Sequence, residues 1–91
     1  MIYRLKRTKR FDKDATLAKK RGKDISKLFA VIEKLANGEK LEDKFRDHTL
    51  TGDYVGFREC HIESDWLLIY EVQDDCLILV LSRTGTHSDL F

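Results

Sequence analysis

The stretch YVGFRECHIESDWLLIYEVQDDCLILVL, residues 54–81, decides the fold of this chain. Three strand-like runs lie within it, separated by polar turns at 63–65 and 73–75. The run over 54–62 alternates, so Phe57, Glu59 and His61 are expected to face one side of a strand. The runs over 66–72 and 77–81 are almost continuously apolar, which is typical of strands covered on both faces. The pattern therefore predicts three consecutive strands joined by hairpins.

The residues before this stretch predict a strand and two helices. Residues 2–7 form a short β-like run, and Thr8 follows where an N-cap is expected. The first helix, with an apolar face that includes Phe11, is predicted to end at Gly22. Asp24 is expected to cap a second helix that ends at residues 37–38, an Asn-Gly pair. The apolar stripe of this second helix comprises Ile25, Leu28, Phe29, Ile32 and Leu35.

The whole pattern predicts an α+β domain with the order β-α-α-β-β-β. A connection of only about three residues requires the two helices to form an antiparallel hairpin. This hairpin is expected to pack on a mainly antiparallel sheet. Residues 39–53 are interpreted as a structured loop, and residues 82–91 as a polar tail outside the core. Residues 1–91 are predicted to form a single domain.

Composition limits the class of protein. A chain of 91 residues with 42% hydrophobic residues is too short for a multidomain enzyme and too apolar for disorder. No apolar run approaches the roughly 20 residues of a membrane-spanning helix. The first residues lack the apolar core of a signal peptide, so we expect a cytoplasmic protein without a membrane partner. Two cysteines without a C-x-x-C pair suit a reducing compartment.

The net charge of +1 conceals two halves of opposite sign. Residues 1–45 carry fourteen Lys and Arg against seven Asp and Glu, whereas residues 46–91 carry three against nine. Such asymmetry favours a polyanionic partner for the basic half. Composition alone supports equally well an ordinary helical surface rich in solvated lysines.

Groups capable of acid–base chemistry gather in the acidic half. All three histidines, His48, His61 and His87, lie there. Imidazoles titrate near neutrality and can serve as general base and general acid. With Arg83 as a fixed cation for a phosphate, such a set could cleave RNA through attack by its own 2′-hydroxyl. That reaction needs no metal or other cofactor.

A zinc site is the competing interpretation of three histidines. Catalytic histidine pairs usually occur as H-x-H or H-x-x-x-H, and neither spacing is present. The isolated glycines fit no phosphate-binding loop. Neither cysteine has a neighbour that argues for a lowered thiol pKa.

Four motifs together resemble the YafQ branch of the RelE/ParE toxin superfamily. They span nearly the whole second half of the chain, and the basic strand and helices before them match as well. The motifs are Asp47-His48-x-Leu50-x-Gly52, Phe57-Arg58-Glu59-Cys60-His61-Ile62, Asp65-Trp66-Leu67-Leu68-Ile69-Tyr70 and Arg83-x-Gly85-x-His87-Ser88-x-Leu90-Phe91.

The resemblance implies a RelE-like fold and an mRNA interferase, which is a ribosome-dependent endoribonuclease of a type II toxin–antitoxin system. A cognate antitoxin would neutralise the toxin, and operator DNA would be contacted only through that antitoxin. The resemblance makes Arg83 the phosphate-stabilising cation and Phe91 a contact that orders the site. It makes Glu59 either a base or the residue that orients His61. The implied acid–base group is His48, His61, Asp65 and His87.

The resemblance also gives the basic half a use as the surface that faces ribosomal RNA. Trp66 is expected either to stack on a base or to lie in the core of the sheet. The residues assigned to RNA or the ribosome are Lys9, Arg10, Lys13, Lys19, Lys20, Arg21, Arg58 and Trp66.

Two other classes of function stay open at this point. One is a non-catalytic binding module, such as a ParE-like gyrase inhibitor or an inactive toxin that acts as co-repressor, because fold alone does not establish activity. The other is a small metal-dependent hydrolase built on the three histidines.

Overall fold

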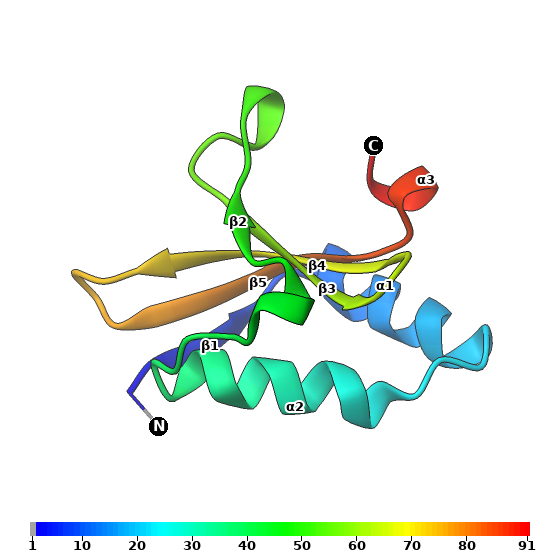
Figure 1. Cartoon of the computed structure of the whole chain (residues 1–91), viewed down its shortest axis with the longest axis horizontal. Helices are drawn as coiled ribbons and strands as arrows, with labels where there is room; N and C mark the ends of the chain where they lie inside the picture. The colour runs from blue at the N-terminus through cyan, green and yellow to red at the C-terminus, as the bar shows by residue number, and fades with distance from the viewer. Residues whose placement is uncertain (1) are drawn as a thin grey trace.

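A five-stranded sheet in the order β1-β5-β4-β3-β2 forms the centre of the molecule (Figure 1). The computed structural model describes residues 2–91. β1 lies parallel to β5, and the other three pairs are antiparallel. The predicted α+β class and mainly antiparallel sheet are therefore confirmed. The elements are β1 (Arg4–Arg7), α1 (Lys9–Lys20), α2 (Ile25–Ala36), η1 (Asp43–Phe45), β2 (His48–Thr49), η2 (Gly52–Tyr54), β3 (Arg58–Glu63), β4 (Trp66–Gln73), β5 (Ile78–Gly85) and α3 (His87–Leu90).

The two long helices begin and end at the residues that the sequence indicated. The Thr8 hydroxyl accepts a hydrogen bond from the backbone N–H of Phe11, and the Asp24 carboxylate accepts one from that of Ser26. Gly22 follows α1 with a φ of 85°, a conformation that glycine adopts without strain. In Figure 1, α1 runs to the right and α2 returns to the left, α1 packing on β5 and α2 on β3. None of the helices in the described part of the chain is long and apolar enough to cross a membrane.

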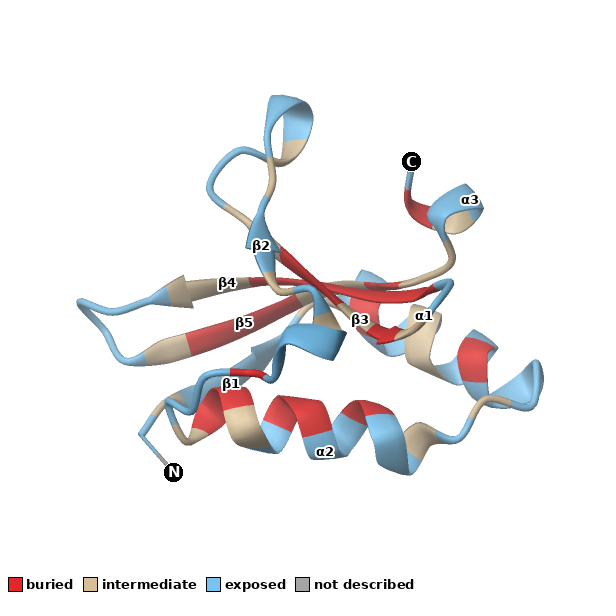
Figure 2. Cartoon of the chain, in the orientation of Figure 1, coloured by how far each residue is buried: buried red, intermediate tan, exposed pale blue. Residues whose placement is uncertain are grey.

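The sheet has two differently covered faces. One face packs on α1 and α2 and forms the main core, in which Leu28, Cys60 and Leu79 are inaccessible to solvent. The other face carries a small cluster of Leu67, Ile69 and Leu90. Figure 2 shows burial concentrated along the strands and on the sheet-facing sides of the helices. The second face, from which β2, η2 and α3 project, is therefore the more open one.

Several details of the predicted elements are wrong. Phe29 was placed in the apolar stripe of α2, but its side chain is 50% exposed because it lies on the outer side of the helix. Residues 54–57 are not strand, since η2 and a turn precede the first residue of β3, Arg58. The segment 39–53, expected to be a loop, contains a two-residue edge strand that pairs His48 with Glu59.

The polar tail predicted over 82–91 is also wrong. β5 continues to Gly85, and the side chain of Thr84 is buried between the indole of Trp66 and the carbonyl oxygen of Leu67. The partners of Ile69 and Tyr70 on β5 are Arg83 and Leu81, so Ser82 is an extra residue in the ladder. Such a bulge changes the direction of the side chains that follow it. It places Arg83 on the strand rather than in a mobile tail.

Candidate active site

Glu59 of β3 lies on the open face, opposite Ile69 of β4, and is only 5% exposed. Its carboxylate oxygen Oε1 lies 3.5 Å from Nε2 of His48 and 3.6 Å from Nε2 of His61. The pairing of β2 with β3 places His48 directly opposite Glu59, while His61 follows two residues later on the same face of β3. A nearly buried carboxylate thus lies between two imidazoles.

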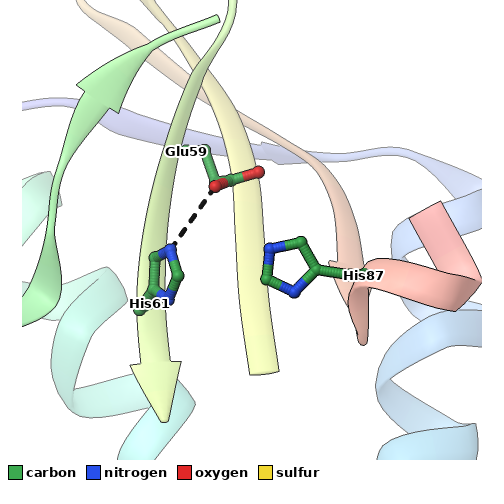
Figure 3. A group of neighbouring side chains, drawn as sticks. All are labelled: Glu59, His61 and His87. Atoms are coloured by element: carbon green, nitrogen blue, oxygen red, sulfur yellow. Dashed lines mark ion pairs between the residues drawn. The ribbon is translucent and has the colours of Figure 1, made fainter. Parts of the chain in front are cut away.

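His87 completes this arrangement from the first turn of α3. Its ring centroid lies 5.9 Å from that of His61, with the two planes 60° apart. One ligand atom from each of Glu59, His61 and His87 lies within 4.8 Å of the others. Figure 3 shows Glu59 and His61 one after the other along β3 and His87 reaching toward them from α3, on the other side of β4. The shared face predicted for Glu59 and His61 is therefore confirmed, and the fold brings His87 to the same place.

Asp65 fixes the orientation of His87. One carboxylate oxygen accepts hydrogen bonds from the backbone N–H of His87 at 3.0 Å and from its ring atom Nδ1 at 2.8 Å. Both bonds lower the pKa of Asp65, and the bond from the backbone N–H has the larger effect. Because Nδ1 donates to the carboxylate, the other ring nitrogen, Nε2, is left available for proton transfer.

A second carboxylate, Asp89, holds α3 itself in place. It accepts a hydrogen bond from the backbone N–H of Thr86, whose hydroxyl in turn accepts from the backbone N–H of Asp89. Arg21 at the end of α1 also binds Asp89, with Nη1 at 2.7 Å from Oδ2. The bond from Arg21 and, to a smaller extent, the bond from the backbone N–H of Thr86 lower the pKa of Asp89 to about 2. The position of His87 thus depends on an ion pair to α1.

Arg83 is paired with Asp14 of α1. Its Nε lies 2.7 Å from Asp14 Oδ2 and its Nη2 lies 3.2 Å from Oδ1. Both side chains are mostly buried, 17% and 14% exposed, and Asp14 also accepts from the backbone N–H of Thr84. Asp14 raises the pKa of Arg83, and Tyr54 contributes in the same direction. Arg83 is therefore a positioned, permanently charged group.

Tyr54 links Arg83 with the aromatic end of the site. Its ring lies 5.4 Å from that of Phe91, and its hydroxyl donates to the carbonyl oxygen of Leu90 at 3.3 Å. Phe91 is 62% exposed and its ring lies 6.3 Å from that of His87. Aromatic contacts therefore run from Tyr54 through Phe91 to His87, and Tyr54 is near enough to Arg83 to affect its pKa.

His48 depends on a loop that is anchored by Asp47. The Asp47 carboxylate accepts hydrogen bonds from Tyr70 and from Nε of Arg58, the latter at 3.3 Å. The preceding residue, Arg46, has a positive φ of 48°, and its carbonyl oxygen lies 2.6 Å from Nδ1 of His48. These contacts direct Nε2 of His48 toward Glu59.

Of the residues assigned to RNA, Trp66 is unsuited to that role, and two arginines are already paired with carboxylates. Trp66 cannot stack on a base, because it is 1% exposed and its indole N–H donates to Thr84. The alternative, a core tryptophan, is correct. Arg58 and Arg21 are engaged by Asp47 and Asp89. The other assigned cations lie exposed on α1: Lys9, Arg10, Lys13, Lys19 and Lys20.

Sequence reasoning missed Asp14 and Tyr54. Asp14 is a carboxylate within a strongly basic helix, and Tyr54 opens the run that was interpreted as a strand. Neither position carries a motif that would distinguish it. The contact between Asp14 and Arg83 joins residues 69 positions apart, so only the folded chain reveals it.

The site could also hold a metal ion. Glu59, His61 and His87 each offer one nitrogen or oxygen ligand, and three such protein ligands are what catalytic zinc sites use. The same three groups are suited to proton transfer, since they combine a carboxylate with two imidazoles on one open face.

Comparison with known proteins decides the family. The model of the YafQ family, bacterial toxins of type II toxin–antitoxin systems, matches residues 3–91. The chain belongs to the YafQ toxin family. The resemblance inferred from the sequence is thereby confirmed, and it extends over both halves of the chain.

Individual YafQ relatives agree with this assignment. The mRNA interferase toxin YafQ of Escherichia coli strain K12 is 43% identical over 82 residues, which cover 89% of this chain and 87% of the relative. YafQ in the crystal structure of the E. coli DinJ–YafQ complex superimposes with a TM-score of 0.90 at 39% identity, covering 98% of both chains. A metal-bound toxin from Helicobacter pylori gives a TM-score of 0.92 at 40% identity, covering both chains fully.

Proposed function

We propose that this chain is an endoribonuclease toxin that cleaves messenger RNA on the ribosome and is neutralised by a cognate antitoxin. The observation that carries the proposal is the approach of Glu59, His61 and His87 to within 4.8 Å on the open face of the sheet. The name of the E. coli relative, an mRNA interferase, supports the same activity.

The proposed reaction uses the RNA as its own nucleophile. A base takes the proton of the 2′-hydroxyl, whose oxygen attacks the adjacent phosphorus, and an acid protonates the departing 5′-oxygen. The products are a 2′,3′-cyclic phosphate and a 5′-hydroxyl. Glu59, His61 and His87 supply the base and the acid, and no metal takes part. Arg83 stabilises the charge that develops on the phosphoryl oxygens.

The remaining site residues support these groups. Asp65 holds the tautomer and orientation of His87 through its bond to Nδ1. His48 lies on the far side of Glu59 and completes the acid–base group. Phe91, exposed beside His87, offers an aromatic surface to a base of the substrate.

Three further assignments rest on the family and on the surface of the molecule. The exposed cations of α1 are suited to ribosomal RNA phosphates. The DinJ–YafQ complex supports an antitoxin as the protein partner, through which any contact with operator DNA would be made. We also infer that residues 1–91 act as one toxin domain in the cytoplasm.

The proposal is tested by single-turnover cleavage of messenger RNA on programmed ribosomes. His87→Ala should cleave about 10²–10⁴-fold more slowly, because a general acid or base is lost. Ser88→Ala, the matched control at the adjacent exposed position, should cleave as wild type does. Thermal melts and ribosome binding of His87→Ala should stay close to wild type, since His87 is exposed.

The same assay separates the alternatives. A non-catalytic module, such as a gyrase inhibitor, would tolerate His87→Ala without loss of toxicity. A metal-dependent hydrolase would lose activity once the toxin alone has been treated with chelator and returned to buffer that contains Mg²⁺ but no transition metal, whereas the acid–base mechanism requires cleavage to continue. Cleavage by His87→Ala within threefold of wild type would show that the acid–base assignment is wrong.

A further inference from the structure

A groove of about 600 Å³ lies between α2, η1 and the outer edge of β3. Its lining includes His61, one of the three groups of the proposed acid–base site, and Ser64 in the turn that follows β3. In Figure 1 the short green turn of η1 lies between α2 and the strands. The groove therefore begins at the proposed site of cleavage and leads away from it over the edge of the sheet. We call it the edge groove.

The charges that line the edge groove are predominantly positive. Among the described residues that line it, the acidic group is Glu63, which Lys23 and Lys27 already bind at 3.3 and 3.1 Å. The cations of the lining are Lys27, Lys34, Lys44 and Arg46. A chain of negative charges is therefore complementary to this groove.

Two of these cations are not used by the fold. Lys27 and Lys34 have acidic partners on the protein. Lys44 and Arg46 are exposed, and neither makes an ion pair with any residue in the range 2–91. Their charges are thus available to a ligand in the edge groove.

An aromatic ring lies between these two cations in the chain. Phe45 is half-buried, so that part of its side chain packs against the main core while the residue also lines the edge groove. Nζ of Lys44 lies 5.2 Å from the centroid of this ring, and Arg46 ends η1 with a φ of 48°. Cations for the phosphates beside an aromatic surface for a base are how proteins bind single-stranded nucleic acid.

The position of His61 favours RNA over an acidic peptide as the occupant. Both are anionic, but only a substrate has to reach the acid–base group. A ribonuclease must also hold nucleotides next to the bond that it cuts, because alignment of the reacting atoms contributes much of the rate. The edge groove opens on His61 and offers such a hold.

We propose that Lys44, Phe45 and Arg46 form a subsite for RNA nucleotides next to the cleaved bond, in which the two cations bind phosphates and the ring stacks on a base. This inference rests on the proposed function for the identity of the substrate. The subsite takes no part in proton transfer and acts by holding the strand. It tolerates any sequence, since every base has a face that can stack.

The test is an NMR titration of the full chain with a nine-nucleotide RNA that is 2′-O-methylated and therefore lacks the nucleophile for cleavage. The backbone amides of Lys44, Phe45 and Arg46 should shift. Lys44→Gln/Arg46→Gln should bind about tenfold more weakly, and the slope of log affinity against log salt should fall by about 1.4, because two phosphate contacts are lost. Thermal melts should match wild type, since both positions are exposed.

A second variant tests the ring. Phe45→Leu keeps an apolar side chain against the core, and it should bind RNA about tenfold more weakly without a change in the salt slope, because stacking is lost and no phosphate contact is. The matched control is Arg4→Gln/Lys6→Gln, which removes the same two charges from exposed positions on β1, at the opposite edge of the sheet. This control should bind within twofold of wild type.

RNA affinity of Lys44→Gln/Arg46→Gln within threefold of wild type, unshifted amides at residues 44–46, or an equal loss in the control would each overturn the proposal. Weaker binding of the double variant to the antitoxin with unchanged binding to RNA would instead assign the edge groove to the protein partner. Because RNA binding is measured without cleavage, a failure of the proposed nuclease activity would be seen separately, in the wild-type assay on ribosomes.

Discussion

The pair of Arg83 and Asp14 shows how a single charged residue is prepared for a role in the site. The carboxylate of Asp14 binds Nε and Nη2, so one edge of the guanidinium is occupied and Nη1 remains for another partner. A long flexible side chain is thereby restricted to one orientation, which reduces the entropy lost when it meets a phosphate. Asp14 is in this sense a positioning residue, and Arg83 is the group that would contact the substrate.

Asp14→Ala should slow cleavage by about ten- to a hundredfold, because Arg83 loses its fixed position. It should also reduce the free energy of unfolding by about 1–3 kcal/mol, since hydrogen bonds to charged, mostly buried groups are lost. Asp14→Asn retains one acceptor oxygen and should recover part of the rate. Single-turnover cleavage and thermal melts measure the two effects.

The control for this prediction is Asp12→Ala. Asp12 lies on the same helix, but its ion pair with Arg7 is 3.5 Å long and more than half exposed. Exposed pairs contribute little, so cleavage and stability should both match wild type. Equal cleavage by Asp14→Ala and wild type would exclude Asp14 from the positioning of Arg83.

Among the elements, α3 is the one whose position depends most on ion pairs. It has only four residues, and its core anchor is Leu90. Two carboxylates bind it: Asp65 lies in the turn before β4, and Asp89 belongs to α3 itself. Both have lowered pKa values. A short helix held in this way is sensitive to the protonation of those carboxylates.

We expect α3 to loosen as the pH falls from about 4 toward 2. The pKa of Asp89 is lowered by folding to about 2, so its contribution is fully present above the unfolded pKa of about 3.9 and is lost below it. The pKa of Asp65 is shifted in the same direction. The protection factors of the amides of His87 and Leu90, measured by NMR relative to the intrinsic exchange rate at each pH, should fall over this interval before those of β4 do.

Arg21→Gln tests the cause of this loosening. Without the guanidinium, α3 should already exchange faster at pH 6, and the additional effect of acid should be smaller. An unchanged protection factor at His87 between pH 5 and pH 2.5 in the wild type would mean that apolar packing of Leu90 alone holds α3.

Local elements were predictable, whereas the partners of polar residues were not. Thr8 and Asp24 could be recognised as caps because a cap binds a backbone group two or three residues away. The extension of β5 through Arg83 and Thr84 was missed because its polar side chains find partners far away in sequence, on α1 and β4. A strand of two residues, such as β2, is too short to produce an alternating pattern.

The candidate site was predicted only in part, because local patterns can be recognised in the sequence and long-range contacts cannot. Glu59 and His61 lie two residues apart on one strand, so the sequence alone predicts that they share a face. The burial of Trp66 could not be inferred, because a nearly continuous apolar run does not show which face the helices cover. Asp14 was unpredictable, since its role exists only where α1 crosses the end of β5.

At the scale of the molecule, the charge asymmetry of the sequence becomes an asymmetry of surfaces. The exposed cations of α1 lie on the helical layer, whereas the acid–base group lies on the opposite face of the sheet. If the helical layer contacts ribosomal RNA, binding and cleavage are carried out by separate surfaces and should be separable by mutation.

Ribosome binding should weaken steeply with salt if the five cations of α1 meet phosphates. Five neutralised phosphates imply a loss on the order of 10²-fold between 50 and 200 mM salt, because each contact releases counterions. Reversal of Lys9, Lys13, Lys19 and Lys20 to Glu should flatten this dependence, as measured by sedimentation with ribosomes. An affinity independent of salt would identify these lysines as an ordinary solvated surface.

The parallel pairing of β1 with β5 has a consequence for the order in which this protein can fold during its synthesis. β1 is made first, yet within residues 2–91 its one partner in the sheet is residues 78–81, which emerge after most of the chain. The hairpins of β3, β4 and β5 involve short sequence separations and can form early, whereas closure of the β1–β5 pair must await a long loop. His87 follows β5 and binds Asp65 in the turn before β4, while Asp89 of the same short helix binds Arg21 just after α1, so α3 takes its position only after β5 is in place. Nuclease activity should therefore appear late and abruptly as the chain is synthesised, after residue 87 has left the ribosome, which leaves a nascent toxin harmless to the ribosome that makes it.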